Sequence, residues 1–152
     1  MRQPTLTPRI QAAFEHATMP RSSSLCKWGN TEGIDEFFHG RTWQALTSPT
    51  LSRYTHALGT FFTDEAFHYY LPAFMIAAVE WPDAGNMEDV IAQSLTPPKL
   101  DVRRPSFASR WALFDRAQRE VTIDVLAHID ARERGVNRLG DAVACLRQTL
   151  DA

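Results

Sequence analysis

Residues 64–79 read DEAFHYYLPAFMIAAV, and from Phe67 onward the side chains are apolar on nearly every face. This pattern is typical of a helix that neighbouring elements surround on several sides. Thr63 stands directly before the stretch as a good N-cap, and the two acids after it favour the positive end of a helix dipole. Pro72 lacks an N–H and clashes with the preceding turn, so the sequence predicts that this central helix is kinked or divided there.

Helix start and stop signals recur on both sides of the central stretch, and no run alternates apolar and polar residues for long enough to make a strand. The sequence therefore predicts an all-α fold, a compact bundle of about six to eight helices in one domain over residues 1–152. Before the central stretch we expect a helix that starts at Thr7-Pro8 with Thr7 as its N-cap, a helix over 32–39 that stops at Gly40, and a helix from Ser48-Pro49 to Gly59. After it we expect helices over 87–95 and through 107–114. A further helix starts at a capping box of Asp115 and Gln118 and ends at Gly135, and the last one starts at Asn137. A basic loop is expected at 99–105.

Length and composition indicate an ordinary globular protein. The chain has 152 residues, of which 44% are hydrophobic, so it can bury a core without a metal or disulfide. The N-terminus lacks the apolar region of a signal peptide, and the longest uncharged stretch, 66–79, is 14 residues and too short to span a bilayer. Cys26 and Cys145 show no CxxC spacing. We expect a cytoplasmic protein with both cysteines free and no membrane contact.

Acidic residues dominate the first two-thirds of the chain. Residues 28–98 carry nine acids against Arg41 and Arg53, whereas residues 99–119 are basic. An acidic surface would steer a basic protein partner, although ordinary patchiness of a solvated surface gives the same count. The acidic residues predicted to bind the partner are Glu32, Asp35, Glu36, Asp64, Glu65, Glu80, Asp83, Glu88 and Asp89.

The four tryptophans divide into two groups. Trp28 stands in a polar segment outside any apolar stripe, so it is either a loop residue folded onto the core or an exposed anchor for a partner. Trp43, Trp81 and Trp111 stand beside apolar neighbours and a polar residue that could accept the indole N–H. We expect these three in the core.

Two further kinds of site were weighed. Glu65 and His68 have E-x-x-H spacing, and Asp124 and His128 share a later helix face, so the four could together hold a metal. The second E-x-x-H motif and the further glutamates of a di-iron bundle are missing, and an exposed histidine near a helix start explains the spacing better. The sequence also lacks a nucleophile elbow and a glycine-rich phosphate loop. We therefore predict no catalytic residue, metal or cofactor.

The net charge of −2 argues against a general nucleic-acid binder, which is usually clearly basic. The alternative of a regulatory nucleic-acid binder has support only from the basic stretch 99–119. The residues that would carry it are Arg103, Arg104, Arg110 and Arg116.

The stretch 65–74, EAFHYYLPAF, resembles the EAFxYYLPAF signature of an uncharacterised family of small bacterial proteins. Residues 38–43, FHGRTW, resemble its FxGxxW segment, and the likeness spans roughly residues 8–130. The resemblance implies a helical domain with no assigned chemistry, and it suggests an immunity or accessory partner of a bacterial secreted toxin. Where such proteins can carry closely spaced cysteines near the first loop, this chain has only Cys26.

These observations lead to a protein-binding domain as the preferred interpretation, most plausibly an immunity protein that neutralises a cognate toxin by binding it. A small enzyme or metal-binding protein of unknown reaction is the alternative. The preference depends on the stretch around Pro72 being interior, so that outward-facing charge performs recognition. Tyrosines lining an open cavity would reverse it.

Overall fold

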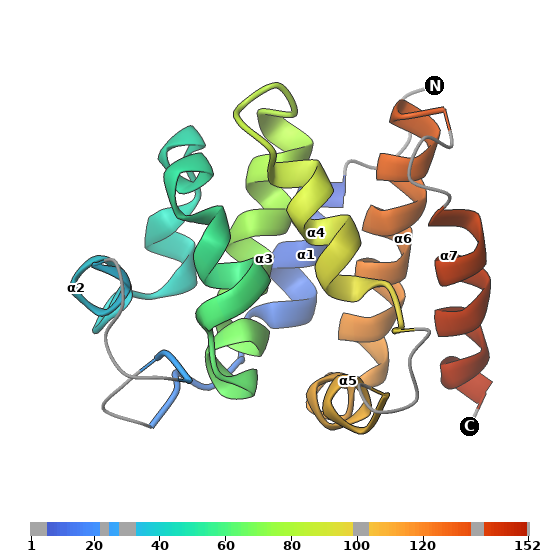
Figure 1. Cartoon of the computed structure of the whole chain (residues 1–152), viewed down its shortest axis with the longest axis horizontal. Helices are drawn as coiled ribbons and strands as arrows, with labels where there is room; N and C mark the ends of the chain where they lie inside the picture. The colour runs from blue at the N-terminus through green and yellow to red at the C-terminus, as the bar shows by residue number, and fades with distance from the viewer. Residues whose placement is uncertain (1–5, 22–24, 28–32, 99–103, 135–138, 152) are drawn as a thin grey trace.

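The molecule is built around one long helix, α3 (Asp64–Glu80), which other helices enclose on several sides (Figure 1). The computed structural model describes residues 6–21, 25–27, 33–98, 104–134 and 139–151. Within these ranges the chain forms seven α-helices and no strand, which confirms the predicted all-α bundle. The other elements are α1 (Leu6–Phe14), α2 (Ile34–Phe38), η1 (Trp43–Leu46), η2 (Pro49–Tyr54), η3 (Ala57–Phe61), α4 (Met87–Leu95), α5 (Arg104–Trp111), α6 (Arg116–Arg132), α7 (Leu139–Gln148) and η5 (Thr149–Asp151).

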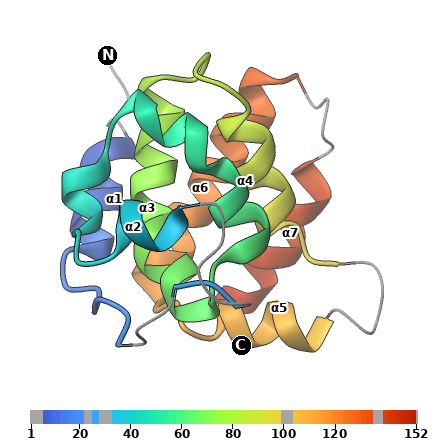
Figure 2. The ribbon, with the colours of Figure 1, turned by 60° about the vertical axis from the view of Figure 1, so that its left-hand side comes forward.

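Most of the other helices pack directly against α3. α1, α4, α5 and α6 contact α3, together with η1 and η2, while α7 packs on the outer side of α6. Figure 2 shows α3 between the α1 side and the α4 side of the molecule, with α7 beyond α6. In Figure 1 the end of α3, the start of α4 and the end of α6 lie at the same end of the bundle.

The central helix is interior, as its sequence predicts. All residues from Tyr69 to Ala78 are buried, and Thr63 caps the helix by accepting the Ala66 N–H at 3.2 Å. The alternative in which Pro72 divides the segment is wrong, because α3 runs unbroken through it. A proline costs about 3 kcal/mol inside a helix, and burial of each large apolar side chain contributes roughly 1.5–3 kcal/mol. Packing around α3 therefore outweighs the cost of the proline.

The tyrosine hydroxyls of α3 are used inside the fold. The Tyr70 hydroxyl donates to the carbonyl oxygens of Phe38 at 2.8 Å and Arg41 at 2.9 Å, which fixes the chain after α2 against α3. The Tyr69 hydroxyl accepts the backbone N–H of Trp43 at 3.4 Å. Both side chains are buried, so they line no open cavity.

The segment after Ser48-Pro49 differs from the single helix that was expected. Ser48 does cap it, with Oγ accepting the Thr50 N–H at 3.2 Å, but the chain then forms the 3₁₀ helix η2 and the π-helix η3. The prediction that Gly59 ends this helix is wrong, because Gly59 lies inside η3. A Cβ at Gly59 would stand 3.5 Å from a Val90 methyl, so the glycine marks the close approach of α4.

Two helix starts differ from the predicted ones. α1 includes Thr7, which therefore does not cap it; the Thr7 hydroxyl instead donates to Glu80 Oε1 at 2.5 Å. α5 begins at Arg104, inside the segment predicted to be the basic loop.

Two other boundaries follow the sequence closely. The capping box is confirmed, because Asp115 Oδ1 accepts the Gln118 N–H at 2.8 Å and Gln118 Oε1 accepts the Asp115 N–H at 3.1 Å. The helix expected over 32–39 covers Ile34–Phe38, and Gly40 follows it with a φ of +76°. Gly135 and Asn137 lie outside the described residues. Neither Cys26 nor Cys145 forms a disulfide.

Candidate partner-binding surface

The predicted acidic residues occupy three separate places within the described chain. Asp35 and Glu36 lie on α2, Asp64 and Glu65 begin α3, and the other four flank the turn between α3 and α4. The 17 residues of α3 separate its two ends by about 24 Å. The acids at the two ends of α3 therefore do not form one small patch. Glu32 and the proposed anchor Trp28 lie outside the described residues.

The acids on α2 and at the start of α3 partly serve the fold. Asp35 Oδ1 accepts the backbone N–H of Leu25 at 2.9 Å. Asp64 Oδ1 lies 3.3 Å from Arg110 Nε, and the same guanidinium stacks over the Phe67 ring at 4.1 Å. This contact ties α5 to the first turn of α3. Asp64 is therefore a structural partner as much as a surface charge.

Two acids of the α3–α4 turn anchor it to other helices. Glu80, the last residue of α3, accepts the Thr7 hydroxyl and so connects α3 to α1. Glu88, in the first turn of α4, accepts two hydrogen bonds from Arg132, from Nε at 2.9 Å and from Nη2 at 3.4 Å. Glu88 in turn raises the pKa of Arg132 by this hydrogen bond and by its charge. These contacts hold the turn in place from both sides.

Asp83 at the tip of the turn is different, because its side chain is fully exposed. It approaches Arg132 only loosely, at 3.9 Å. Asp89, in the first turn of α4, is also an exposed residue. The turn thus combines carboxylates that anchor it with carboxylates that face solvent.

Trp81 lies in the middle of this acidic turn and corrects one prediction. Its side chain is 38% exposed, and its indole N–H has no hydrogen-bond partner in the described part of the chain. Trp43 and Trp111 are buried as expected, and their indoles donate to the Phe14 carbonyl at 3.3 Å and to the Thr149 hydroxyl at 2.9 Å. The expectation that Trp81 belongs with them in the core is wrong. The helix ends at Trp81, so its ring lies beyond the last enclosed turn.

Gly85 fixes the shape of the turn. Its φ is +61°, which favours glycine, and a Cβ there would lie 2.9 Å from Ser52 Cβ. The backbone of the turn therefore rests directly on η2. This contact and the ion pair of Glu88 hold the backbone between Trp81 and α4 against the rest of the fold.

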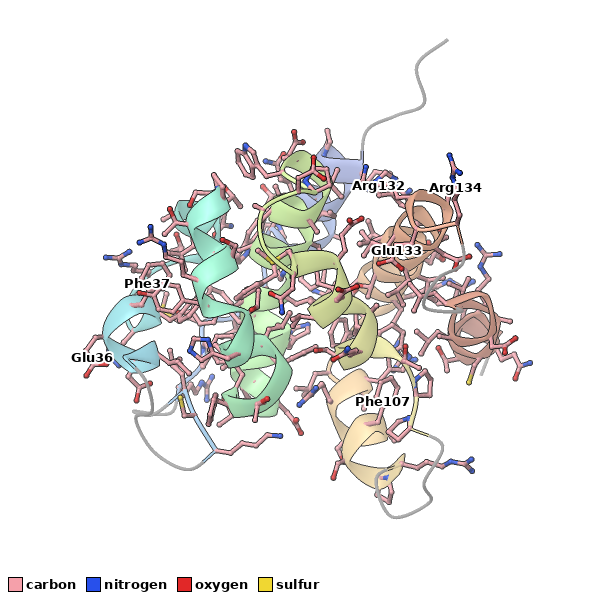
Figure 3. The ribbon with its side chains drawn as sticks, turned by 45° about the horizontal axis from the view of Figure 1, so that its top comes forward. Glu36, Phe37, Phe107, Arg132, Glu133 and Arg134 are labelled. Atoms are coloured by element: carbon pink, nitrogen blue, oxygen red, sulfur yellow. The ribbon has the colours of Figure 1, made fainter. Side chains whose placement is uncertain are left out.

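The charges at this end of the bundle are strongly unequal. Residues 80–89 contain four carboxylates and no basic residue. The end of α6 adds Arg132, Glu133 and Arg134, which Figure 3 shows grouped together. Five carboxylates against two guanidinium groups give this surface a net charge of −3. We call the turn of residues 80–89 with residues 132–134 the acidic turn surface.

The residues weighed for a metal site are not brought together. No group of three or more His, Cys, Asp or Glu side chains able to hold a metal occurs within the described ranges. Asp124 is paired with Arg9 at 2.6 Å, on the face of α6 that contacts α1. Glu65 and His68 instead border a surface hollow of about 400 Å³ with residues 18–21 and Leu113.

The His68 ring is half-buried and is held by contacts within the fold. Its Nε2 lies 2.8 Å from Gln118 Oε1, and its ring packs edge-on against Phe114. Gln118 Oε1 also accepts the Asp115 N–H, so this oxygen is an acceptor and His68 Nε2 carries the proton. This hydrogen bond occupies Nε2, so only Nδ1 of the ring keeps a lone pair.

The basic residues weighed for nucleic acid are also largely engaged in the fold. Arg110 pairs with Asp64, and Arg116 pairs with Glu120 at 3.0 Å. Arg104 donates to the Pro98 carbonyl at 3.4 Å, and Arg103 lies outside the described residues. The stretch therefore presents less free positive charge than its sequence suggests.

Comparison with known proteins places the chain in a wider group without giving it an activity. The model of a family of unknown function, DUF6714, matches residues 3–147. No curated protein and no solved structure matches the chain. Within the described ranges, none of the helices combines the length and the apolar character needed to cross a membrane.

Proposed function

The chain belongs to a family of unknown function, DUF6714, and on this premise we propose that it is a protein-binding domain whose contact surface is the acidic turn surface. Its most specific form is an immunity protein that neutralises a cognate bacterial toxin by covering a basic active cleft. The observation that carries the proposal is the exposure of Trp81 among carboxylates on a turn that the fold holds rigid.

Trp81 has the properties of an interface anchor. Tryptophan is enriched among the few residues that contribute most of the binding free energy at protein interfaces. The other tryptophans within the described residues, Trp43 and Trp111, are buried and hydrogen-bonded. Trp81 differs from both because its ring is partly exposed and its indole N–H is left to solvent. A partner that covered the ring could also accept its indole N–H. Binding would then satisfy a donor that the free protein leaves to solvent.

The surrounding carboxylates determine the kind of partner. A net charge of −3 on a small surface attracts a positively charged protein and accelerates its encounter. Because the turn is anchored through Glu80, Glu88 and Gly85, association orders few further residues. The surface therefore suits a basic partner that binds without large rearrangement of this domain.

The experiment uses the product of the neighbouring gene as the partner to be tested. We would measure its association with the full chain by surface plasmon resonance, and growth of cells that express both proteins. Trp81→Ala should weaken binding about 30-fold or more, through faster dissociation, because an anchor of this kind contributes at least ~2 kcal/mol. Asp83→Lys should instead slow association, and the effect should shrink in high salt.

Two matched controls distinguish this surface from general damage. Leu113→Ala removes a large apolar side chain that is 43% exposed and lies beside the start of α3; within the described ranges it is the other exposed one besides Trp81. Glu65→Lys reverses a charge at that same far end of α3. Both should leave binding unchanged. Absence of a complex together with absence of growth rescue contradicts the immunity form, and equal losses in the controls contradict the assignment to the acidic turn surface.

A further inference from the structure

We infer that the pocket between η3 and α4 is a second binding site, for a small, uncharged, polyhydroxylated ligand of about monosaccharide size. The pocket has a volume of about 250 Å³ and lies between the π-helical segment and the outer face of α4. It is separate from Trp81 and from the hollow beside His68. It shares Asn86 with the acidic turn surface, but none of the charged residues of that surface and not Trp81.

The lining of the pocket determines the ligand chemistry. Among the described residues no Lys, Arg, Asp or Glu side chain lines it, and a site without a counter-charge does not compensate the loss of hydration of an ion. Its side chains are nearly all able to form hydrogen bonds, with Val90 as the one large apolar group. The polar residues that line it are Thr55, His56, Thr60, Asn86, Gln93 and Ser94. Hydroxyls and side-chain amides in this proportion fit a neutral ligand with several hydroxyl groups.

The size of the pocket narrows the ligand further. Sites for drug-sized ligands usually occupy about 300–1,000 Å³, so a pocket of about 250 Å³ suits a smaller molecule. Gly59 contributes to this space, because a Cβ there would lie 3.5 Å from the Val90 methyl. Any larger side chain at position 59 would fill part of the pocket.

A π-helical turn forms one wall of the pocket. The Phe62 N–H donates to the Ala57 carbonyl five residues earlier, at 2.9 Å, which closes the wide turn of η3. Such turns are rare, and they occur frequently at functional sites, where they reposition the residues around them. Here the segment carries His56, Gly59 and Thr60 to the pocket.

Ser94 provides the second, independent observation. Its Oγ is buried and has no hydrogen-bond partner in the described part of the chain. A buried hydroxyl without a partner destabilises a fold, so an alanine at this position would serve the fold better. Serine has three staggered rotamers, so a pocket-lining hydroxyl can turn to meet a ligand without movement of α4. Ser94 also lines the pocket, so a bound ligand could supply the partner that its hydroxyl lacks in the fold.

The test titrates the full chain with D-glucose, D-mannose and D-galactose up to 50 mM, each followed by backbone amide shifts in NMR spectra and by thermal unfolding. D-gluconate and D-glucosamine serve as charged probes of similar size. We expect at least one neutral sugar to shift amides in residues 55–60 and 86–94 and to raise Tm, while the charged probes do neither. Failure of all three neutral sugars, or equal binding of the charged probes, overturns the inference.

Two variants distinguish a site from a merely structural feature. Ser94→Ala should raise Tm without ligand while weakening sugar binding tenfold or more, which a structural role for the hydroxyl would not produce. Gly59→Val should abolish binding by filling the pocket, and Thr47→Ala, at a half-buried threonine outside the pocket, should leave it unchanged. Sugar binding that survives both pocket variants contradicts the site. Trp81→Ala should retain sugar binding, so this inference and the proposed function can fail separately.

Discussion

Arg132 Nε lies 2.9 Å from Glu88 Oε2, and this contact joins the end of α6 to the first turn of α4. The Glu88 side chain is only 13% exposed, whereas that of Arg132 is 40% exposed. Arg132 therefore connects two helices and also reduces the negative charge of the surface next to Trp81. These two roles have opposite consequences for stability and for partner binding.

Arg132→Ala should accelerate association with a basic partner while lowering Tm. The substitution removes a cation from the acidic turn surface, so the attraction becomes stronger, and it breaks the contact to Glu88. At low salt we expect about a two- to fivefold higher association rate, with the difference disappearing in high salt. Stopped-flow or surface plasmon resonance measures the rate.

Arg9→Ala is the matched control for this gain. Arg9 is 44% exposed and forms a comparable ion pair with Asp124, at 2.6 Å. Its loss should leave the association rate unchanged. A slower association of Arg132→Ala would mean that the guanidinium itself contacts the partner.

Gly85→Ala should destabilise the fold more than the same change at Gly40. Both glycines have positive φ, +61° and +76°, but only a Cβ at Gly85 would collide with Ser52, at 2.9 Å. We expect a loss of about 2–3 kcal/mol for Gly85→Ala and about 1 kcal/mol for Gly40→Ala in denaturant unfolding. Adding Ser52→Gly should recover part of the first loss, and no recovery would mean that the collision is relieved in another way.

Stability should fall as pH rises above about 10, partly through Tyr70. Burial raises the pKa of this phenol well above its ordinary value of 10, so the unfolded chain releases the proton first and unfolding becomes more favourable. The contribution of this proton changes by up to about 1.4 kcal/mol per pH unit. Tyr70→Phe should be less stable at pH 8 by about 1–3 kcal/mol, since two carbonyls lose their donor, but its stability should decline less steeply.

Urea unfolding of both proteins between pH 8 and pH 11 measures this difference. The pKa of Tyr69 is also raised by burial, so the variant keeps part of the slope. The two stability curves should converge as pH rises. Parallel curves would show that the pKa of Tyr70 is the same in the folded and the unfolded chain.

Thr122→Val should stabilise the protein. Thr122 on α6 is fully buried, and its hydroxyl has no hydrogen-bond partner within the described ranges. Replacing the hydroxyl with a methyl group removes this cost, which should raise the free energy of unfolding by about 1 kcal/mol. Thr55→Val is the control with the opposite sign, because the Thr55 hydroxyl donates to Asn86 at 3.0 Å. Thermal unfolding of both variants measures the two changes in stability. A lower stability of Thr122→Val would show that the Thr122 hydroxyl has a hydrogen-bond partner in solution.

The central helix could be predicted because its local and tertiary signals agree. The cap at Thr63, the acids after it and the apolar run all indicate one buried helix, and the capping box at Asp115 is equally local. The segment from Ser48 to Gly59 could not be predicted in detail. The serine cap and the glycine are also typical of a regular helix, so no local signal reports the 3₁₀ and π turns that the segment forms.

The candidate surface was predicted only in part. The charge count along the sequence includes the acids of residues 80–89, but it places them in one set with acids at the far end of α3. A count along the sequence contains no information on the length of that helix. Trp81 was assigned to the core since its apolar neighbours continue the buried run. The available signal was its position between Glu80 and Pro82-Asp83, where the helix ends and the ring passes beyond the enclosing helices.

Hydrogen exchange of the full chain, with and without the neighbouring gene product, tests the central claim most directly. The account predicts that binding slows exchange of amides in residues 80–90 and 129–134, the backbone of the acidic turn surface and its support. Amides at the start of α3 and in α5 should exchange as in the free protein. Protection confined to those latter segments, with residues 80–90 unchanged, would contradict the assignment of this surface.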